Sequence, residues 1–161
     1  MPAETGPGPG EPAPGFVLPN QYGEPVSLER MAGKPVVLVF YPFAFSRVCS
    51  GELAELAALQ PEFRAAGASL LAVSCDAKYS LRAWATEQGW EFGLLSDFWP
   101  HGAVARRYGV FDENRGLATR SSFVIGADGV IRTVLSSAMG EPRDQAAYRK
   151  ALLELSTAGR S

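Results

Sequence analysis

The 161-residue sequence is poor in the residues that build metal clusters and disulfide scaffolds. It contains two cysteines and a single histidine. Two cysteines are too few for the disulfide framework of a small secreted protein. One histidine with two cysteines cannot supply a usual zinc-binding spacing. We therefore expect no metal and no structural disulfide network, so that each cysteine is either reactive or simply buried.

Long hydrophobic runs and an excess of one charge are also lacking. No stretch approaches the roughly 20 apolar residues of a membrane span, and the N-terminus lacks the basic, then apolar order of a signal peptide. The net charge is -2 and the basic residues are scattered. This pattern argues against a nucleic-acid surface or a polybasic membrane patch. We expect a soluble cytoplasmic protein, and small-molecule chemistry remains open.

Length and composition predict one globular domain with a tail. A chain of 161 residues that is 47% hydrophobic can bury a core without staples. The first fifteen residues hold nine prolines and glycines and no aromatic or branched aliphatic residue. Such a segment cannot supply a packed core. We predict a disordered tail over 1–14, one domain over 15–158, and a C-terminal tail over 159–161.

Strand and helix patterns alternate along the domain. Apolar runs predict strands at 16–18 and 26–28 (a hairpin), 35–41, 70–73 and 92–95, and in the runs SSFVI and VIRTVL, which flank an Asp-Gly turn. Helical periodicity covers 50–66, 81–88 and 143–155, and Pro61 should break the first of these near Leu59. A strand, a helix and a strand within about 40 residues form a right-handed βαβ unit with parallel strands. The sequence thus predicts an α/β fold, with a central mixed sheet flanked by helices and an N-terminal β-hairpin.

Cys49 follows the predicted central strand, in the run YPFAFSRVCSGE at 41–52. Free backbone N–H groups and the helix dipole at a helix N-terminus favour a thiolate. Lowering a thiol pKa from about 8.5 to about 6 raises the thiolate fraction at pH 7 about 30-fold, equivalent to about 2 kcal/mol. This gain in thiolate fraction is modest by itself. If the thiolate is to reduce a peroxide rapidly, the site also needs hydrogen-bond donors aimed at the two peroxide oxygens, such as the Ser46 hydroxyl, backbone N–H groups and a guanidinium.

Two separated motifs resemble the peroxiredoxin family. Pro42-x-x-x-Ser46-x-x-Cys49 is similar to the signature Pro-x-x-x-Thr/Ser-x-x-Cys, and Arg120, just before SSFVI, matches the second active-site arginine. The runs LSDFWPHGAV at 95–104 and YGVF at 108–111 resemble the one-cysteine alkyl hydroperoxide reductase E type of actinobacteria. The resemblance spans roughly 14–155 and implies a thioredoxin-like fold and thiol peroxidase activity.

The resemblance also implies the site and its partners. Pro42 would shield the pocket, Ser46 would hydrogen-bond the peroxide, Cys49 would attack it, Arg120 would hold thiolate and substrate, and Glu52 would orient the arginine. The resulting sulfenic acid would be recycled by a low-molecular-weight thiol or a glutaredoxin-like or thioredoxin-like donor, with no cofactor, in a homodimer. Serine at 46 lacks the methyl group of the commoner threonine, which bears on rate rather than reaction type.

Simpler interpretations remain for each of these residues. A lone cysteine is usually a small buried hydrophobe, and Arg120 or Ser46 alone would more often be a strand-end charge or a turn residue.

The second cysteine, Cys75, closes the predicted strand that follows the Cys49 helix in the sequence. We expect it to be a buried structural thiol; a resolving role would require its Cα within about 7 Å of that of Cys49. We expect four aromatic residues to pack in the core or at a dimer interface: Phe45, Trp84, Phe98 and Trp99. We expect His101 to lie at a helix start or at an interface.

Two other functions fit parts of this pattern. A thiol-disulfide oxidoreductase would use Cys-x-x-Cys, whereas Cys49 is followed by Ser50-Gly51-Glu52. A redox-sensing or chaperone-like protein would change its assembly on oxidation rather than clear peroxide. The rate of Cys49 oxidation separates the peroxidase from this sensor.

Overall fold

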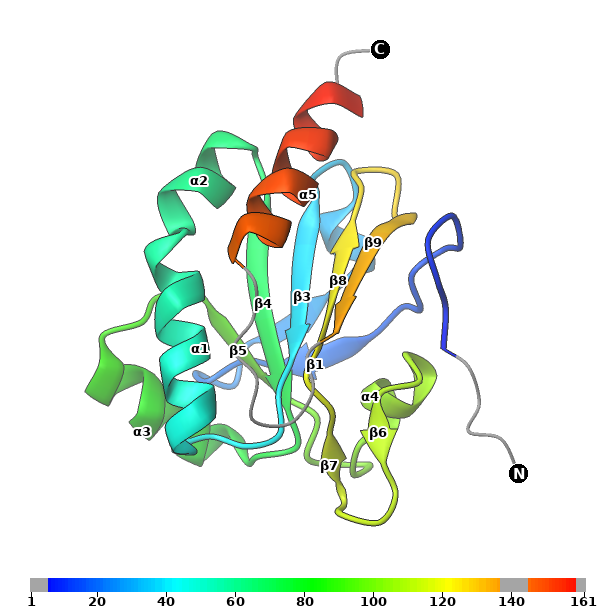
Figure 1. The fold of residues 1–161 in the computed structure, drawn as a ribbon. Coiled ribbons are helices and arrows are strands. Elements are labelled where there is room, and N and C mark those ends of the chain that lie inside the picture. The colour runs from blue at the N-terminus through cyan, green and yellow to red at the C-terminus, as the bar shows by residue number, and fades with distance from the viewer. Residues whose placement is uncertain (1–5, 137–144, 159–161) are drawn as a thin grey trace.

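The computed structural model describes residues 6–136 and 145–158, and of residues 47–49 and 156–158 it describes the backbone only. A five-stranded sheet in the order β5-β4-β3-β8-β9 forms its centre (Figure 1). Strands β3, β4 and β5 are parallel, while β8 is antiparallel to β3 and to β9. The bounds are β3 Val36–Phe40, β4 Ser69–Ser74, β5 Gly93–Ser96, β8 Ser121–Ile125 and β9 Ile131–Ser136. The predicted mixed sheet is confirmed.

The predicted break in the first helix is also confirmed. Helix α1 covers Arg47–Ala58, and α2 covers Gln60–Ala65, with Pro61 in its first turn. Proline has no N–H for an intrahelical hydrogen bond, so the helix restarts there. Leu59 lies between the two helices and is buried. Helix α3 covers Lys78–Gln88 and ends at Gly89, whose φ of 73° is the left-handed conformation that glycine readily adopts. Helix α5 covers Gln145–Ala158; the predicted start at 143 lies outside the described residues.

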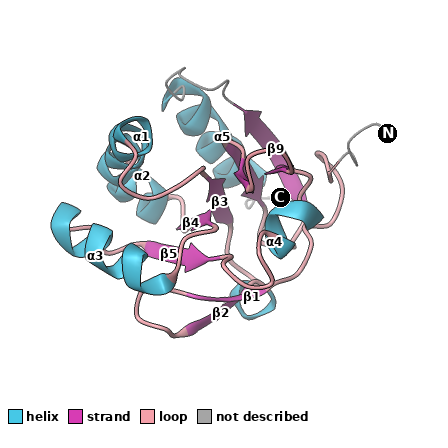
Figure 2. Cartoon of the chain, turned by 90° about the horizontal axis from the view of Figure 1, so that it is seen from below, coloured by secondary structure: helices cyan, strands magenta, loops and turns pink. Residues whose placement is uncertain are grey.

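Alternate side chains of the strands face two hydrophobic clusters, one on each side of the sheet. One cluster joins residues such as Val37 and Val39 to α1, α2, α3 and α5. The other joins Val36, Leu38 and Phe40 to the N-terminal hairpin and to the segment after β5. Figure 2 shows the helical layer on one side of the sheet and the hairpin on the other. Because both faces are covered, β3 is buried at all five positions.

The N-terminal hairpin is present, with β1 at Val17–Pro19 and β2 at Pro25–Ser27. The buried Gln21 side chain ties its turn to β5, since its amide donates to Phe92 O at 3.0 Å and its oxygen accepts from Leu94 N–H at 2.9 Å. This interaction anchors a small hairpin that could not be stable alone.

The expectation of a disordered tail over 1–14 was wrong for part of that segment. Gly10 N–H donates to Ile131 O at 2.8 Å, and Ile131 N–H donates to Glu11 O at 2.9 Å. The Tyr108 hydroxyl donates to Pro14 O at 2.7 Å. A segment without aromatic or branched aliphatic side chains still carries backbone donors and acceptors, and these pair with the edge strand β9. Residues 1–5 and 159–161 lie outside the described residues.

Apart from a helix start offered for His101, the sequence did not predict three short elements between β5 and β8, nor a turn of 3-10 helix at Glu29–Met31. They are α4 Ala103–Arg107, β6 Phe111–Asp112 and β7 Leu117–Ala118. Elements this short lack a detectable period. The buried Asp97 side chain holds the first of them, accepting from Val104 N–H at 3.1 Å and Ala105 N–H at 2.9 Å.

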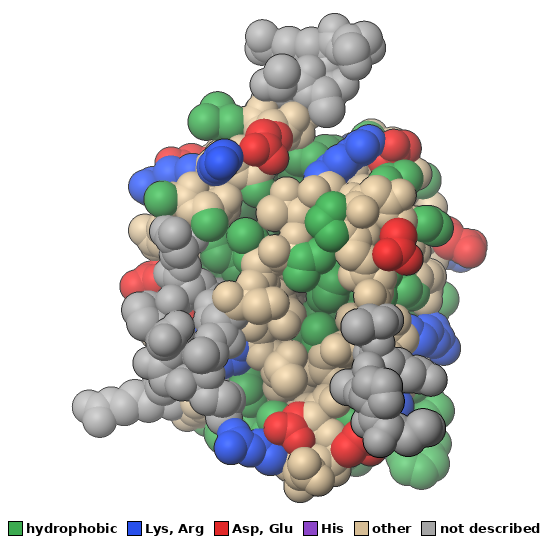
Figure 3. Space-filling view, turned by 45° about the vertical axis from the view of Figure 1, so that its right-hand side comes forward, with side chains coloured by type: hydrophobic (Ala, Val, Ile, Leu, Met, Phe, Trp, Pro, Cys, Tyr) green, Lys and Arg blue, Asp and Glu red, His purple; other side chains and the backbone are tan. Residues whose placement is uncertain are grey.

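Charged side chains of both signs are interspersed on the face drawn in Figure 3. Within 6–136 and 145–158, none of the helices has the length and apolar character needed to cross a bilayer.

Candidate active site

The chain leaves β3 at Phe40 and enters α1 at Arg47, and the six residues between form a turn at the carboxyl edge of the parallel strands (Figure 1). Pro42 in this turn is buried and Ser46 is half-buried. Ser50 N–H donates to Ser46 O at 2.8 Å, which is the first bond of the helix. Helix α1 thus begins three residues before the predicted start. Cys49 therefore lies in the first helical turn, where backbone N–H groups have no intrahelical acceptor.

Phe45 gives this turn a strained backbone. Its φ is 65°, and within the described part of the chain it is the one non-glycine residue with a positive φ. The left-handed conformation costs an ordinary residue about 1–2 kcal/mol. Its ring is about half exposed and lies 6.1 Å from the ring of buried Trp84. Strained residues of this kind persist only where their surroundings hold them.

A buried ion pair lies at the same edge. Arg120 immediately precedes β8, whose first residue Ser121 is paired with Phe40, the last residue of β3. The Arg120 guanidinium contacts the Glu52 carboxylate, and the two side chains are 2% and 4% exposed. Positions 49 and 52 share one face of α1, since residues three apart are neighbours on a helix. The structure thus brings Pro42, Ser46, Glu52 and Arg120 to the sheet edge at which α1 begins.

Cys75 directly follows β4 and is a free, buried thiol. Burial raises the pKa of this thiol to about 12, and the negative charges of Asp97 and Asp76 act in the same direction. A thiol that stays protonated is a poor nucleophile, since the thiolate is the reactive form. Burial and the raised pKa of its thiol favour the buried structural role expected of Cys75 over a resolving role.

The aromatic residues divide into two groups. Trp84 is fully buried in the core, as expected. Phe98 and Trp99 are not core residues, because their exposed fractions are 53% and 82%. His101 precedes α4, and its Nε2 lies 2.7 Å from Gly116 O. This histidine ties the loop after β5 to the turn between β6 and β7.

Sequence reasoning passed over two carboxylates at this edge. Asp76 and Asp97 follow β4 and β5, and both accept backbone N–H groups. Burial raises the pKa of Asp97, while the N–H groups of Ala105 and Val104 lower it. The signal was available, because both residues lie within three positions of the ends of predicted parallel strands, whose carboxyl ends meet at one edge.

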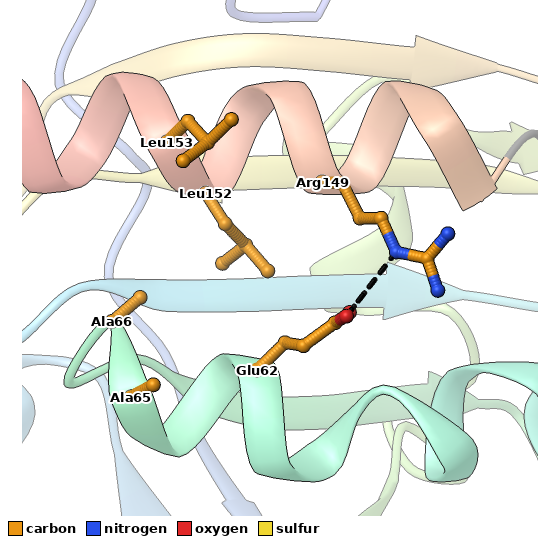
Figure 4. A pocket seen from close by; sticks show the side chains of 6 residues that line it. All are labelled: Glu62, Ala65, Ala66, Arg149, Leu152 and Leu153. Atoms are coloured by element: carbon orange, nitrogen blue, oxygen red, sulfur yellow. Dashed lines mark hydrogen bonds and ion pairs between the residues drawn. The ribbon is translucent and has the colours of Figure 1, made fainter.

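An apolar hollow elsewhere offers no chemistry of this kind. It lies between α2 and α5, lined by Ala65, Ala66, Leu152 and Leu153, and an ion pair of 3.2 Å between Arg149 and Glu62 spans it (Figure 4). None of these side chains is a nucleophile. Among residues 6–136 and 145–158, no group of three or more histidine, cysteine, aspartate or glutamate side chains is placed to hold a metal.

Comparison with known proteins identifies the class of protein to which this fold belongs. The model of the AhpC/TSA family matches residues 9–134. Alkyl hydroperoxide reductase E of Mycobacterium tuberculosis is 44% identical over 147 residues, covering 91% of this chain and 96% of the relative. The crystal structure of Peroxidoxin BcpB from Mycobacterium tuberculosis superposes with a TM-score of 0.82 at 34% identity, covering 96% of this chain and 99% of that one. The crystal structure of Enterococcus faecalis AhpC superposes with a TM-score of 0.86 at 28% identity, covering 94% of each chain.

The chain therefore belongs to the AhpC/TSA family, and it is a peroxiredoxin of the alkyl hydroperoxide reductase E type. Its activity is that of a thiol-dependent peroxidase. The predicted thioredoxin-like fold is confirmed, and the sensor and oxidoreductase alternatives are not favoured.

Proposed function

We propose that Cys49 is the peroxidatic nucleophile of this enzyme. The Cys49 thiolate attacks the terminal oxygen of hydrogen peroxide or an organic hydroperoxide. An S–O bond forms as the O–O bond breaks, and the leaving oxygen takes a proton to depart as water or alcohol. Cysteine sulfenic acid remains, with sulfur oxidised by two electrons. Peroxynitrite would react in the same way and leave nitrite.

The buried ion pair of Arg120 and Glu52 carries this proposal. The guanidinium is held by a carboxylate at the edge where the Cys49 turn begins, in a region with little water to screen its charge. A fixed positive charge stabilises both the thiolate and the negative charge that develops on the leaving oxygen. In this proposal Ser46 donates to the bound peroxide, Pro42 limits water access, and Glu52 orients the guanidinium.

Recycling requires an external thiol. The sulfenic acid condenses with one thiol to give a mixed disulfide and water, and a second thiol releases Cys49 by exchange. A buried Cys75 whose pKa is raised to about 12 supports an external donor over an internal one. We propose a low-molecular-weight thiol, or a glutaredoxin-like or thioredoxin-like protein, as found in the reducing cytoplasm.

We further propose that the active form is a homodimer. Large exposed aromatic side chains on one protein are typical of an interface. Phe43, Phe45, Phe98 and Trp99 are each about half exposed or more, and they lie in the segments that follow β3 and β5 at the carboxyl edge. Sedimentation of the intact chain tests this proposal: a monomer at micromolar concentration would contradict it.

Replacing Arg120 by alanine tests the electrostatic role. Stopped-flow mixing with hydrogen peroxide gives the rate of Cys49 oxidation, and the pH dependence of iodoacetamide alkylation gives the Cys49 pKa. We expect Arg120→Ala to lower the oxidation rate by more than its effect on the thiolate fraction explains. Equal losses in thiolate fraction and rate would show that Arg120 acts on ionisation alone and refute its role on the oxidant.

A further inference from the structure

The turn at 42–46 needs a restraint that the motif itself does not supply. Phe45 is held at a φ of 65°, in the left-handed region that residues with a side chain rarely adopt. Without an external contact, such a residue would relax and move the start of α1 with it. The restraint acts on the residue on its N-terminal side, Ala44, and it comes from the segment that follows β4.

Asp76 is the acceptor for this turn. Ala44 N–H donates to Asp76 Oδ2 at 2.7 Å, across the gap between the segments that follow β3 and β4. The Ser74 hydroxyl donates to the same oxygen at 2.6 Å. Ser74 is completely buried, so its hydroxyl has little freedom to turn away. Hydrogen bonds to an ionised acceptor are short and stronger than neutral ones.

The main chain of Asp76 is fixed as well. The Ser96 hydroxyl, at the end of β5, donates to Asp76 O at 2.5 Å. Asp97 N–H donates to Ser74 O at 2.8 Å. The carboxylate is thus held by the ends of β4 and β5, two rigid strands, and it presents one oxygen to the turn that follows β3. This arrangement is a fixed acceptor rather than a mobile surface charge.

We infer that Asp76 is a positioning residue of the peroxidase site. It acts through Ala44, by holding the turn on which Ser46 and the first residues of α1 are placed. The inference rests on the proposed role of Cys49. Directed donors lose effect steeply with displacement, and a shift of about 1 Å can lower a rate by about 100-fold. Loss of the Asp76 acceptor therefore lowers the rate of peroxide reduction more than it lowers the general reactivity of the Cys49 thiolate.

The test compares Asp76→Ala with Asp76→Asn in the intact chain. The amide oxygen of asparagine can still accept from Ala44 N–H and the Ser74 hydroxyl, whereas alanine cannot. We expect Asp76→Ala to lower the second-order rate constant with hydrogen peroxide by about 10-fold to 100-fold, and Asp76→Asn to restore most of it. Iodoacetamide alkylation of Cys49, assigned by mass spectrometry, needs no donors aimed at oxygen and should fall much less in Asp76→Ala.

Asp128→Ala is the matched control. Asp128 also accepts a backbone N–H, from Val130 at 3.1 Å, but in the β8–β9 turn at the opposite end of the sheet. The rate constant of Asp128→Ala with hydrogen peroxide should equal that of the native chain.

The inference is overturned if Asp76→Ala keeps the native peroxide rate, or if Asp76→Asn loses as much as Asp76→Ala. It is also overturned if Asp76→Ala lowers the rates of peroxide reduction and of Cys49 alkylation by the same factor, since a general loss of folding would lower both rates equally. These outcomes differ from failure of the proposed function, in which the native chain itself would oxidise no faster than a free thiol.

Discussion

The buried pair of Glu52 and Arg120 makes a sharp prediction about stability. Replacing Glu52 by alanine removes the carboxylate that contacts the Arg120 guanidinium, a charged group that is 2% exposed. Removing one member of a buried pair typically costs about 3–5 kcal/mol, because the remaining buried charge loses its counter-charge and is poorly solvated. Typical domains are stable by about 5–15 kcal/mol. Glu52→Ala should therefore lose a large part of the free energy of unfolding.

Urea denaturation followed by circular dichroism measures this loss. The midpoint should fall with an unchanged m-value, since the surface exposed on unfolding hardly changes. The double variant Glu52→Ala/Arg120→Ala should be more stable than Glu52→Ala alone, because it no longer buries the guanidinium without the Glu52 carboxylate. This non-additivity is the signature of a buried pair.

Glu62→Ala is the control. Glu62 pairs with Arg149 at 3.2 Å, but both side chains are about half exposed. An exposed pair is worth about 0–1 kcal/mol, so this variant should unfold almost like the native chain. A loss of unfolding free energy in Glu52→Ala no larger than that in Glu62→Ala would contradict the buried pair. Simple addition of the losses of Glu52→Ala and Arg120→Ala in the double variant would contradict it as well.

Two further predictions concern Ser46 and Cys75. Ser46→Ala should lower the stopped-flow rate constant with hydrogen peroxide by about 100-fold, as for loss of one directed donor, while Ser46→Thr keeps or raises it; an unchanged rate in Ser46→Ala would remove the hydroxyl from the mechanism. Burial raises the pKa of the Cys75 thiol from its ordinary value of 9.0 to about 12, so the folded state keeps a proton that the unfolded chain loses between these two pH values. Stability should therefore fall as pH rises above 9, by about 1.4 kcal/mol per pH unit more in the native chain than in Cys75→Ala. Parallel pH profiles for these two proteins in urea titrations would contradict the burial assigned to this thiol.

The elements predicted from sequence are those whose signal is local. The run at 35–41 has no polar position, which fits only a strand covered on both faces, and β3 is such a strand. Pro61 removes a helical hydrogen bond wherever the helix lies, so the break at Leu59 needed no tertiary information. The Asp-Gly pair at 128–129 likewise marks the β8–β9 turn.

The elements that sequence reasoning missed are fixed by contacts between distant segments. Helix α4 has only five residues, and the Asp97 side chain accepts hydrogen bonds from two of its N–H groups. The segment at 10–13 pairs through its backbone, which composition does not report. Of the site, the sequence indicated Cys49 and Arg120 through motifs. It contained no pattern that would pair Ala44 with Asp76, because that contact depends on the neighbouring placement of β3 and β4.

The most direct test of this account is the oxidation of the native chain by one equivalent of hydrogen peroxide, followed by stopped-flow fluorescence and mass spectrometry. We expect Cys49 to be converted to sulfenic acid far faster than a free thiol, Cys75→Ser to keep this rate, and Cys49→Ser to abolish it. Oxidation that is no faster than that of a small thiol, or that falls first on Cys75, would contradict it.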